Sequence, residues 1–468
     1  MIFTEFRFIL FFILVFFVYW RLPNRRIKTL WLLGCSYIFY GVWDWRFLSL
    51  IIGSTLIDYV VGHKIYSSKQ KKVKNRWLIV SLAVNLGILG FFKYFNFFID
   101  SSIRLFEATG IPLNSVTLNI VLPVGISFYT LQTLSYSLDI YFGKLKPQKS
   151  LLNLACFVAF FPQLLAGPIV RASDFLPQLI VEQKFRSIDV KSCLALFMIG
   201  FFKKACISDN LAPFIDSYFT SIDSYTALSG WLAVVSYAVQ IYCDFSGYSD
   251  MAIACAGLLG YQLCNNFDSP YFSSSITEFW RKWHISLSNW LRDYLYIPLG
   301  GNRSGQLSMY RNLMLTMLLG GLWHGAAWRF VVWGALHGVA LVCHKEWSKL
   351  WDKQSLMHKT AKIWGVFLTF YWVCLTWIFF RANSFMDALT VVKAYVFFQA
   401  PGNQQLEPRL WLILPGLVAL HWLTAQTSWP RFIDRLPNRV FSISYGCMAS
   451  FLMLFMPTGY APFIYFQF

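Results

Sequence analysis

The sequence predicts an all-α polytopic membrane protein, and three observations lead to this fold class. Of the 468 residues, 57% are hydrophobic and only 13% are charged, whereas an average soluble domain carries about 25% charged residues. Apolar stretches near the length of a membrane-spanning helix recur along the chain, at about 20 residues per crossing. The basic residues gather in short runs between these stretches. Together these features exclude disordered, coiled-coil, collagen-like and secreted disulfide-rich proteins.

The apolar stretches predict a bundle of about 10–14 transmembrane or re-entrant helices. We expect them near residues 6–20, 29–43, 46–62, 77–98, 119–142, 151–166, 190–208, 227–245, 248–264, 311–323, 325–344, 362–380, 384–399, 409–425 and 440–457. Several stretches are too short to cross untilted, so we expect some to be re-entrant or interfacial. Ile9–Trp20 resembles a signal sequence, but basic residues follow it in place of a cleavage site, so it is predicted to be the first membrane helix.

The placement of basic residues predicts the orientation of the chain. Lys and Arg number 40 against 22 Asp and Glu, a net charge of +18. The loops 21–28 and 64–76 are basic and the turn Val42–Arg46 is not, so both loops are predicted to be cytoplasmic and the N-terminus to lie outside. The same alternation puts Asp100–Thr117 outside and Lys144–Lys149 in the cytoplasm. Because this charge follows membrane topology, we expect no binding to nucleic acid.

No sequence feature divides the chain, so we expect one integral-membrane domain over residues 1–468. No internal repeat is visible, which argues against a secondary transporter. The 10 cysteines show no CxxC pair or zinc-ligand spacing, and no two histidines stand four residues apart, so no metal site is predicted. Motifs for a hydrolase elbow, an ATPase or a dinucleotide site are also missing.

The densest polar chemistry lies in the block Phe267–Arg303. We expect a helix that starts near Glu278, is capped by Ser275 or Thr277 and is broken at Pro298. Its tryptophans alternate with basic residues, which is typical of a helix lying at the membrane interface with its rings at headgroup depth.

His284 is predicted to lie inside this helix. By itself, a histidine here would be an interfacial side chain bonded to backbone or lipid. A functional role is the alternative, because Asn289, Arg292 and Asp293 bring further hydrogen-bonding groups within three helical turns.

His324 lies in the otherwise apolar run Leu318–Trp328, LLGGLWHGAAW. An ionisable group within a membrane segment is costly and is therefore a functional candidate. The small neighbours Gly321, Gly325 and Ala326 would let a backbone or a slender ligand approach closely. The alternative is a small-residue packing motif in which His324 bonds across a helix interface.

The remaining histidines are predicted to be structural. If the helix after His324 were continuous, His337 would point about 140° away from it, so the two would not share a cavity. His344 would lie on the same side as His337. The other three flank loops or helix ends: His63, His358 and His421.

Two further motifs combine glycine with charge. Gly167–Pro168 stops a helix and is followed by Arg171 and Asp174, which resembles a re-entrant turn with a charge pair at its mouth. Asp244 and Asp250 flank a glycine kink in an apolar setting. Paired carboxylates can perform acid–base chemistry, but a spacing of six does not put them on one helical face, so a structural role is favoured.

The combined motifs resemble the membrane-bound O-acyltransferase family, in particular its alginate-acetylating branch, which is related to branches that alanylate teichoic acid or acetylate peptidoglycan. Any one motif would be weak and their combination is specific. The matching segments are AGPIVRASDFLPQL (166–179), DFSGYSDMAIACAGLLGY (244–261), FWRKWHISLSNWLRDYLYIPLGGNR (279–303), LGGLWHGAAWRFVVWGALHG (319–338) and PFIYFQF (462–468).

The resemblance implies that His324 is the essential histidine and that His284 stands where the wider family has Asn, Asp or His. His324 would act as base or as a covalent acyl carrier, and His284 would orient it or stabilise the oxyanion. The helices would surround a central tunnel or funnel. Residues expected along the substrate path are Trp283, Ser286, Asn289, Arg292, Asp293, Arg303 and Trp323; the two arginines would contact donor phosphates if their loop faces the cytoplasm.

The resemblance also implies the substrates. The acyl donor would be acetyl-CoA or another acetyl thioester, with no tightly bound cofactor. The acceptor would be an extracytoplasmic polysaccharide, alginate-like first, with cellulose and peptidoglycan as alternatives. A separate periplasmic acetyltransferase would complete the transfer, and the protein would span a bacterial inner membrane many times. Two other functions stay open from the residues alone: a transporter or flippase, and a non-catalytic subunit of a polysaccharide secretion complex.

Overall fold

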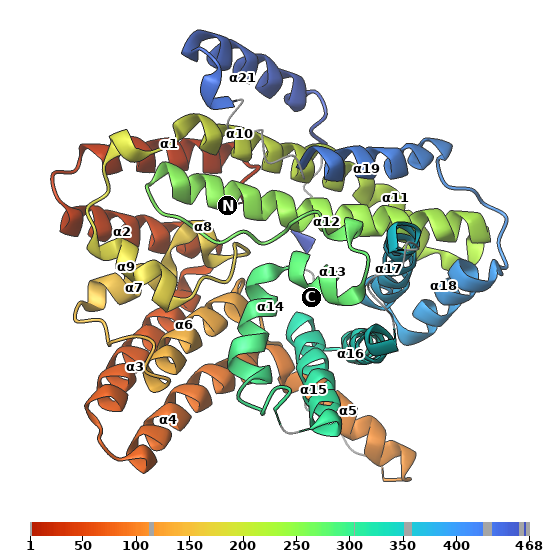
Figure 1. Ribbon diagram of the computed structural model, residues 1–468, viewed down its shortest axis with the longest axis horizontal. Helices are drawn as coiled ribbons and strands as arrows, with labels where there is room; N and C mark the ends of the chain where they lie inside the picture. The colour runs from red at the N-terminus through yellow and green to blue at the C-terminus, as the bar shows by residue number, and fades with distance from the viewer. Residues whose placement is uncertain are drawn as a thin grey trace. The chain divides into compact units, whose positions relative to one another are not determined.

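The computed structural model describes residues 2–111, 117–303, 305–350, 358–424, 433–457 and 463–464. Within these ranges the regular structure is helical, apart from one isolated bridge between Tyr225 and Gln404. The predicted all-α class is therefore confirmed (Figure 1). The helices group into two compact units that are interleaved in the sequence: residues 1–193 with 252–264, and residues 194–251 with 265–468. The expectation of one integral-membrane domain stays a prediction.

Three helical stretches of the described chain are long and apolar enough to cross a membrane by length and composition. They are Arg25–Ser67, Lys71–Ala108 and Lys362–Arg381, and Pro408–Leu423 is a shorter apolar stretch. The predicted number of crossings and the central tunnel stay predictions.

The first unit contains the N-terminal helices. They are α1 (Phe6–Arg21), α2 (Arg25–Asp44), α3 (Leu48–Ser67), α4 (Lys71–Leu89), α5 (Phe95–Ala108), α6 (Ile126–Tyr141), α7 (Leu151–Ala159), α8 (Phe161–Leu164) and α9 (Ala172–Ile180). The first three match the predicted helices within a few residues. A π-helical turn at Gly90–Tyr94 joins α4 to α5, and α5 runs into the segment expected as an outer loop. Gly167–Pro168 lies between α8 and α9, so the predicted helix stop is confirmed.

The core of the first unit is α6, whose side chains from Ile126 to Ile140 are all buried. Helices α3 and α4 pack against it and share a carboxylate with it. Asp58 accepts hydrogen bonds from Ser137 (2.7 Å), from Asn85 (2.8 Å) and from Ser81. A buried carboxylate needs such donors to replace water, so this cluster ties three helices together.

The basic loops of the first unit lie at one end of it. The Tyr141 hydroxyl donates to the Asn75 side chain (2.7 Å), and the Tyr59 hydroxyl donates to the carbonyl of Lys149 (2.9 Å). Arg25 donates to the carbonyl of Ile180 (2.7 Å). Arg25 also lines one pocket with Lys146 and Lys149, so the three loops predicted to be cytoplasmic lie at the same end, as the charge alternation requires.

The second unit holds the helices that build the candidate site. They are α11 (Asp209–Thr220), α13 (Ile276–Lys282), α14 (Ile285–Leu291), α15 (Gln306–His324), α16 (Trp328–Leu350), α17 (His358–Arg381), α18 (Phe385–Phe397), α19 (Ile413–Thr424) and α21 (Asn438–Met453), with most of α12 (Ala227–Leu258). A π-helical segment, Phe202–Ser208, connects α10 (Val190–Phe201) to α11.

Helix α12 corrects one prediction: residues 227–245 and 248–264 are not two helices, because Ala227–Leu258 is continuous. Gly247 does not interrupt it. A Cβ atom at Gly247 would lie 2.6 Å from the carbonyl oxygen of Gly200, so this glycine permits a close backbone approach. Isolated glycines are tolerated within helices at a cost of about 1 kcal/mol relative to alanine.

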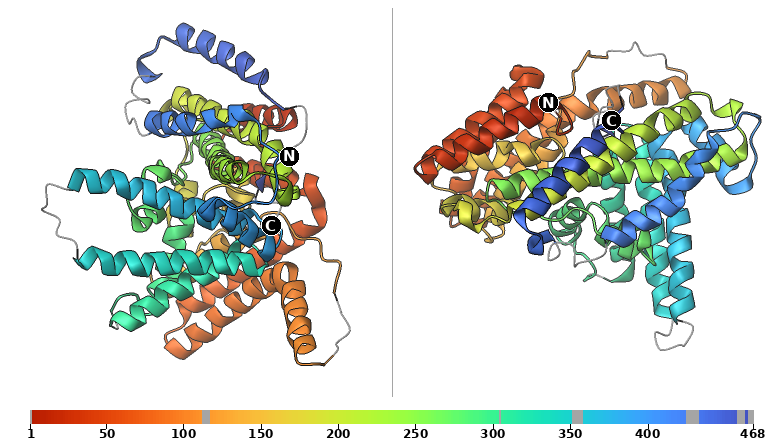
Figure 2. Two further views of the ribbon diagram at one scale, coloured as in Figure 1. Left: turned by 90° about the vertical axis from the view of Figure 1, so that its right-hand side faces the viewer. Right: turned by 90° about the horizontal axis from the view of Figure 1, so that it is seen from above.

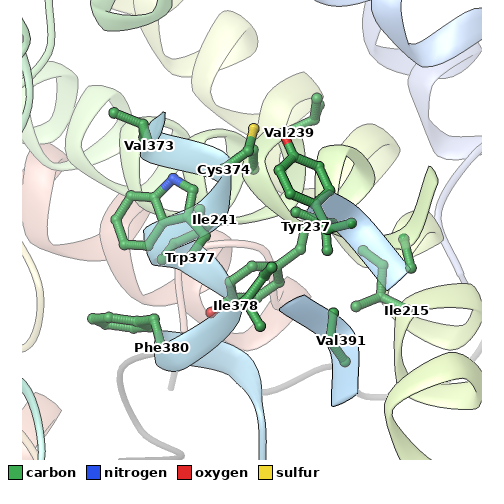
Figure 3. Close-up of a cluster of buried hydrophobic side chains, with 14 of the residues drawn as sticks. Ile215, Tyr237, Val239, Ile241, Val373, Cys374, Trp377, Ile378, Phe380 and Val391 are labelled. Atoms are coloured by element: carbon green, nitrogen blue, oxygen red, sulfur yellow. The ribbon is translucent and has the colours of Figure 1, made fainter. Parts of the chain in front are cut away.

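The apolar core of the second unit joins α11, α12, α17 and α18. Figure 3 shows Tyr237 and Ile241 of α12 beside Trp377 and Ile378 of α17, with Val391 of α18 close by. A helix such as α12, which is buried on all sides, is typical of the interior of a large protein or of a membrane bundle. It therefore provides a fixed frame for the polar residues that it carries.

Helices α15 and α16 form a tight hairpin in which the backbones touch. A Cβ atom at Gly321 would lie 2.2 Å from the carbonyl oxygen of Phe330, and one at Gly334 would lie 2.2 Å from that of Met317. Helix α16 also packs along α17, and the left view of Figure 2 shows the two running alongside each other. The predicted close approach around the glycines of this run is confirmed.

We expect Gly334→Ala to destabilise the protein. The added Cβ would collide with the backbone carbonyl of Met317, which cannot move aside as a flexible side chain could. Overpacking of this kind costs about 1–3 kcal/mol or more. Gly416→Ala in α19 is the matched control, since no atom lies within 4 Å of its added Cβ. Thermal unfolding of the detergent-solubilised variants would measure the difference, and equal midpoints for the two would contradict this packing.

Candidate active site

The predicted single helix after Glu278 is wrong, because the chain breaks between α13 and α14 at Trp283 and His284. The start is as predicted: the Ser275 hydroxyl caps α13 by accepting the N–H of Glu278 (3.2 Å). The break has a local signature. His284 adopts φ 43° and ψ 54°, a left-handed conformation that few non-glycine residues adopt.

The tryptophans of this segment are also placed differently from the prediction. Trp283 is 1% exposed and packs against Phe279, Phe267 and Trp377 within the second unit, and Trp290 is buried as well. Rings packed against other core side chains cannot contact lipid headgroups, so the predicted headgroup contact is wrong for Trp283 and Trp290. These two rings support the segment from inside the second unit.

A hydrogen-bond network around Asn266 fixes the ring of His284, which is fully buried. The side-chain oxygen of Asn266 accepts from the backbone N–H of Ser286 (3.3 Å), from the Ser286 hydroxyl (2.9 Å) and from His284 Nδ1 (3.1 Å). Its amide nitrogen donates to the hydroxyl of Ser249 in α12 (3.2 Å). Because the Ser286 N–H can only donate, the atom facing it must be the amide oxygen.

This network selects one tautomer of His284. An amide oxygen cannot donate, so Nδ1 carries the proton and Nε2 carries the lone pair of the neutral ring. Burial lowers the pKa of His284 to about 3, so the ring stays neutral at physiological pH. His284 can thus accept a hydrogen bond at Nε2 while the ring stays neutral.

His324 ends α15 and is 4% exposed. Its ring lies among aromatic side chains from three helices: Trp323 of α15 at 5.0 Å, Trp333 of α16 at 5.1 Å and Phe380 of α17 at 5.3 Å between ring centroids. All three are edge-on contacts. An apolar cage of this kind excludes water from the ring and strengthens any electrostatic interaction made there.

The two predicted catalytic histidines come together although 40 positions separate them. Their ring centroids are 6.5 Å apart with an angle of 56° between planes, and Trp323 lies 6.1 Å from His284. At this separation two imidazoles can both act on one reacting group. The arrangement suits acyl transfer, which needs proton acceptance at a hydroxyl and charge stabilisation at a carbonyl.

The C-terminal segment supports the wall behind His284. Phe245 of α12 contacts the His284 ring edge-on at 4.6 Å. Phe463 packs in turn against Phe245 at 5.9 Å and against Tyr248 at 4.9 Å. The next residue, Ile464, donates its backbone N–H to Asp244 (2.8 Å), so the end of the described chain is bound to α12 beside the site.

Asp244 belongs to a buried cluster of ion pairs. Lys204 Nζ lies 2.6 Å from Asp244 and 2.5 Å from Asp209, and all three side chains are less than 10% exposed. Asp250 pairs separately with Lys203 at 2.7 Å. Each carboxylate forms an ion pair with a buried lysine. This supports the structural interpretation of Asp244 and Asp250 over a role in acid–base chemistry.

The other predicted path residues divide into two groups. Ser286 and Trp323 lie at the histidine pair, and Trp283 packs one layer behind it. Arg292 and Asp293 pair with each other (2.6 Å) in the π-helical turn Arg292–Tyr296, with Arg292 exposed. Asn289 is half-buried and Arg303 exposed, and no contact that the structure gives joins either to the histidines.

His337 has both ring nitrogens bonded and packs beside the site. Trp280 donates to its Nδ1 (3.3 Å), and its Nε2 lies 3.0 Å from the Thr376 hydroxyl. The assumption of a continuous helix from His324 is wrong, because Gly325–Ala327 separate α15 from α16. The Trp333 ring contacts both His324 and His337, with ring centroids 5.1 and 4.7 Å apart, respectively. The structural interpretation of His337 still holds.

Three further observations concern histidine and metal chemistry. His344 bonds Thr277 (2.9 Å), and His421 packs on Tyr242 and Tyr271 in the core of the second unit. The side chain of His358 lies outside the described residues. Among the described residues, no group of three His, Cys, Asp or Glu side chains could hold a metal ion.

Sequence reasoning missed Asn266, Phe245 and Lys204. Asn266 gave no signal, since its role depends on contacts with Ser249 and Ser286 that only the fold creates. Lys204 did give a signal in the sequence, because two adjacent lysines, Lys203 and Lys204, within a predicted apolar helix require buried counter-charges. The nearby carboxylates Asp209 and Asp244 supply them.

Comparisons with known proteins agree with this geometry. Residues 144–386 match the model of the MBOAT, membrane-bound O-acyltransferase family. The chain is 42% identical over 401 residues to a probable alginate O-acetylase AlgI of Pseudomonas putida, covering 85% of this chain and 81% of that protein. It is 40% identical over 400 residues to a peptidoglycan O-acetyltransferase of Helicobacter pylori, covering 80% and 74%.

A more distant relative comes from another branch. A teichoic acid D-alanyltransferase of Bacillus subtilis is 28% identical over 284 residues, covering 57% of this chain and 70% of that protein. The matched family region contains both histidines and the hairpin that carries His324. The chain therefore belongs to the membrane-bound O-acyltransferase family and is an acyltransferase.

Proposed function

We propose that this protein transfers acetyl groups from a thioester donor toward an extracytoplasmic polysaccharide of the alginate type. The observation that carries the proposal is the pairing of His284 and His324, 6.5 Å apart in a buried aromatic site. The identity to a probable alginate O-acetylase supports the acetyl group and the polymer. Peptidoglycan is the second candidate acceptor, supported by the Helicobacter pylori relative.

In the proposed reaction an acceptor hydroxyl attacks the thioester carbonyl. The new C–O bond forms as the hydroxyl proton passes to an imidazole, the C–S bond breaks, and the thiolate leaves and takes up a proton. His324 is the proposed base, since its cage of Trp323, Trp333 and Phe380 keeps water from competing for the acyl group. If transfer proceeds in two steps, the same ring would carry the acyl group.

The tautomer of His284 supports one of its two predicted roles over the other. An oxyanion stabiliser must donate a hydrogen bond, and the proton of the neutral ring is already engaged with Asn266. The lone pair on Nε2 can instead accept a hydrogen bond, which suits orienting His324. We therefore assign His284 the orienting role.

The donor and partners follow from the same proposal. The donor is acetyl-CoA or another acetyl thioester reached from the cytoplasm, and a separate periplasmic acetyltransferase completes transfer to the polymer. The protein would cross the bacterial inner membrane many times, with the basic loops at one end of the first unit facing the cytoplasm.

The proposal would be tested by expression in a host that makes both alginate and peptidoglycan, keeps its periplasmic acetyltransferase and lacks its own membrane-bound O-acyltransferase. Base-released acetate would be measured on each purified polymer, with an empty vector as control. Acetyl ester that rises on alginate confirms the proposed acceptor, and a rise on peptidoglycan alone favours the second candidate. A wild-type protein that raises neither would overturn the acetylation of both polymers.

Replacing Asn266 with alanine should lower acetyl transfer by about 10²-fold, the scale expected when a catalytic group is misplaced by about 1 Å. The change frees the His284 ring to rotate and to change tautomer. Ser249→Ala is the matched control, because it removes only the bond at the other end of the amide. Acetate per polymer at equal membrane abundance is the readout, and equal activity of the two variants would contradict this role.

A further inference from the structure

The first unit contains a cavity of about 460 Å³ between the start of α2, the end of α9 and the segment before α7. All of its walls belong to this one unit. Its polar lining combines cationic side chains with neutral donors: Arg25, Lys146, Gln148, Lys149, Ser150 and Asn153.

The cavity walls are held open by hydrogen bonds. The Tyr59 hydroxyl donates to the carbonyl of Lys149 (2.9 Å), and the backbone N–H of Gln148 donates to the Tyr136 hydroxyl (2.9 Å). Arg25 donates through one nitrogen to the carbonyl of Ile180 (2.7 Å). The segment that carries the lysines is thus pinned to α3 and α6, so the cavity is present before any ligand arrives.

The charge around the cavity has a single sign. As far as the structure describes its lining, Arg25, Lys146 and Lys149 face no Asp or Glu there. None of the three joins the ion pairs found among the described residues. The three positive charges around the cavity repel each other, and a bound anion would reduce that repulsion.

The nature of the lining narrows the class of anion. Arginine matches the oxygen geometry of phosphate, and lysine serves as a point charge beside it. The remaining wall, with Leu145 and Pro177, is apolar and can cover the carbon portion of an ester. A volume of this size falls within the range of small-molecule sites. Both lysines and Arg25 come from loops predicted to be cytoplasmic, so the ligand would arrive from that side.

We propose that this cavity is a binding site for a phosphate ester. The phosphate belongs either to a soluble phosphoester such as coenzyme A or to the headgroup of an anionic phospholipid. With coenzyme A as ligand the proposal rests on the proposed function, and with a lipid headgroup it goes beyond it. The site is tested by binding alone, so it can fail while the proposed function holds, and the reverse.

The test uses the full-length protein in nanodiscs of phosphatidylcholine, titrated with coenzyme A by calorimetry. The double variant Lys146→Gln, Lys149→Gln should weaken binding at least tenfold. The matched control is Lys71→Gln, Lys72→Gln, which removes the same charge from exposed positions at the start of α4. Affinity of the control should change less than twofold.

A second arm distinguishes the source of the phosphate. Nanodiscs containing phosphatidylglycerol would be analysed by native mass spectrometry for lipid retained on the protein. Retention by wild type and control but not by the cavity variant, without coenzyme A binding, assigns the site to a lipid headgroup. If the cavity variant and the control bind coenzyme A equally and retain phosphatidylglycerol equally, the proposal is wrong, because general surface charge would then explain any binding.

Discussion

Replacing His324 with alanine should lower acetyl transfer by between about 10² and 10⁴-fold, the usual contribution of a positioned proton acceptor. The change removes the only ring that lies both inside the cage of Trp323, Trp333 and Phe380 and within 6.5 Å of His284, among the ring contacts of the described residues. The helices around it need not move, because the hairpin is held by backbone contact at Gly321 and Gly334.

Acetyl ester per polymer, compared at equal membrane abundance, is the measurement. His324→Gln should be as inactive as alanine, since an amide keeps the size and loses the base. His344→Gln is a suitable control, because that half-buried histidine bonds only Thr277 among its described partners. Full acetylation by both His324 variants would mean that the transporter or scaffold interpretations must be reconsidered.

The largest loss of stability is expected for Lys204→Met. One lysine neutralises two carboxylates here, and its removal leaves Asp209 and Asp244 facing each other without a cation in the core of the second unit. Breaking a buried ion pair by removing one partner costs about 3–5 kcal/mol. Lys204→Arg keeps the charge and should retain most of the stability.

Because one lysine neutralises two carboxylates, removing the lysine should destabilise the protein more than removing one of the carboxylates. Asp244→Asn leaves Lys204 with Asp209 as a one-to-one pair, so it should destabilise less than Lys204→Met. Glu346→Gln, in the exposed pair with Lys349, should change stability much less than either, because solvent screens exposed ion pairs. Unfolding midpoints in detergent would rank these variants, and a harmless Lys204→Met would show that the cluster carries little energy.

Asp244→Asn also separates stability from activity. The same carboxylate binds the N–H of Ile464, which places Phe463 against Phe245 and so behind His284. A variant that folds but acetylates less would indicate that this contact positions the site. Asp250→Asn, in the neighbouring pair with Lys203, removes a charge without touching the C-terminal segment.

Much of the fold was predictable because hydropathy reports helices directly. The helices α1 to α3 and the hairpin of α15 and α16 match the predicted stretches closely. The predictions failed at two points inside long segments of uniform composition, where the sequence does not show whether a helix continues or ends. Nothing in the residues around Gly247 shows that the helix continues there, and nothing around His284 shows that it stops, because each outcome depends on what packs against that turn.

The site was predictable in its principal residues and not in its supports. His324 was identifiable as an ionisable group in an apolar run, and His284 through family resemblance. Their approach to 6.5 Å, the role of Asn266 and the anchoring by Asp244 arise from segments far apart in the chain. A pattern within one segment carries no information about such contacts. Arg292 and Arg303 were predicted to contact donor phosphates, and the fold leaves both exposed.

The left-handed backbone at His284 has a consequence for how mutagenesis at this position must be interpreted. A scan through common residues would report two quantities at once, the fit of the residue to the turn and the chemistry of its side chain. Valine or isoleucine would fail for the first reason whatever the second. Glycine removes the imidazole while accepting the turn, and asparagine accepts it with a polar group in place. Asn, Asp and His, the residues that resemblance implies here, are also those that tolerate this backbone best, so part of that preference belongs to the turn and not to the reaction.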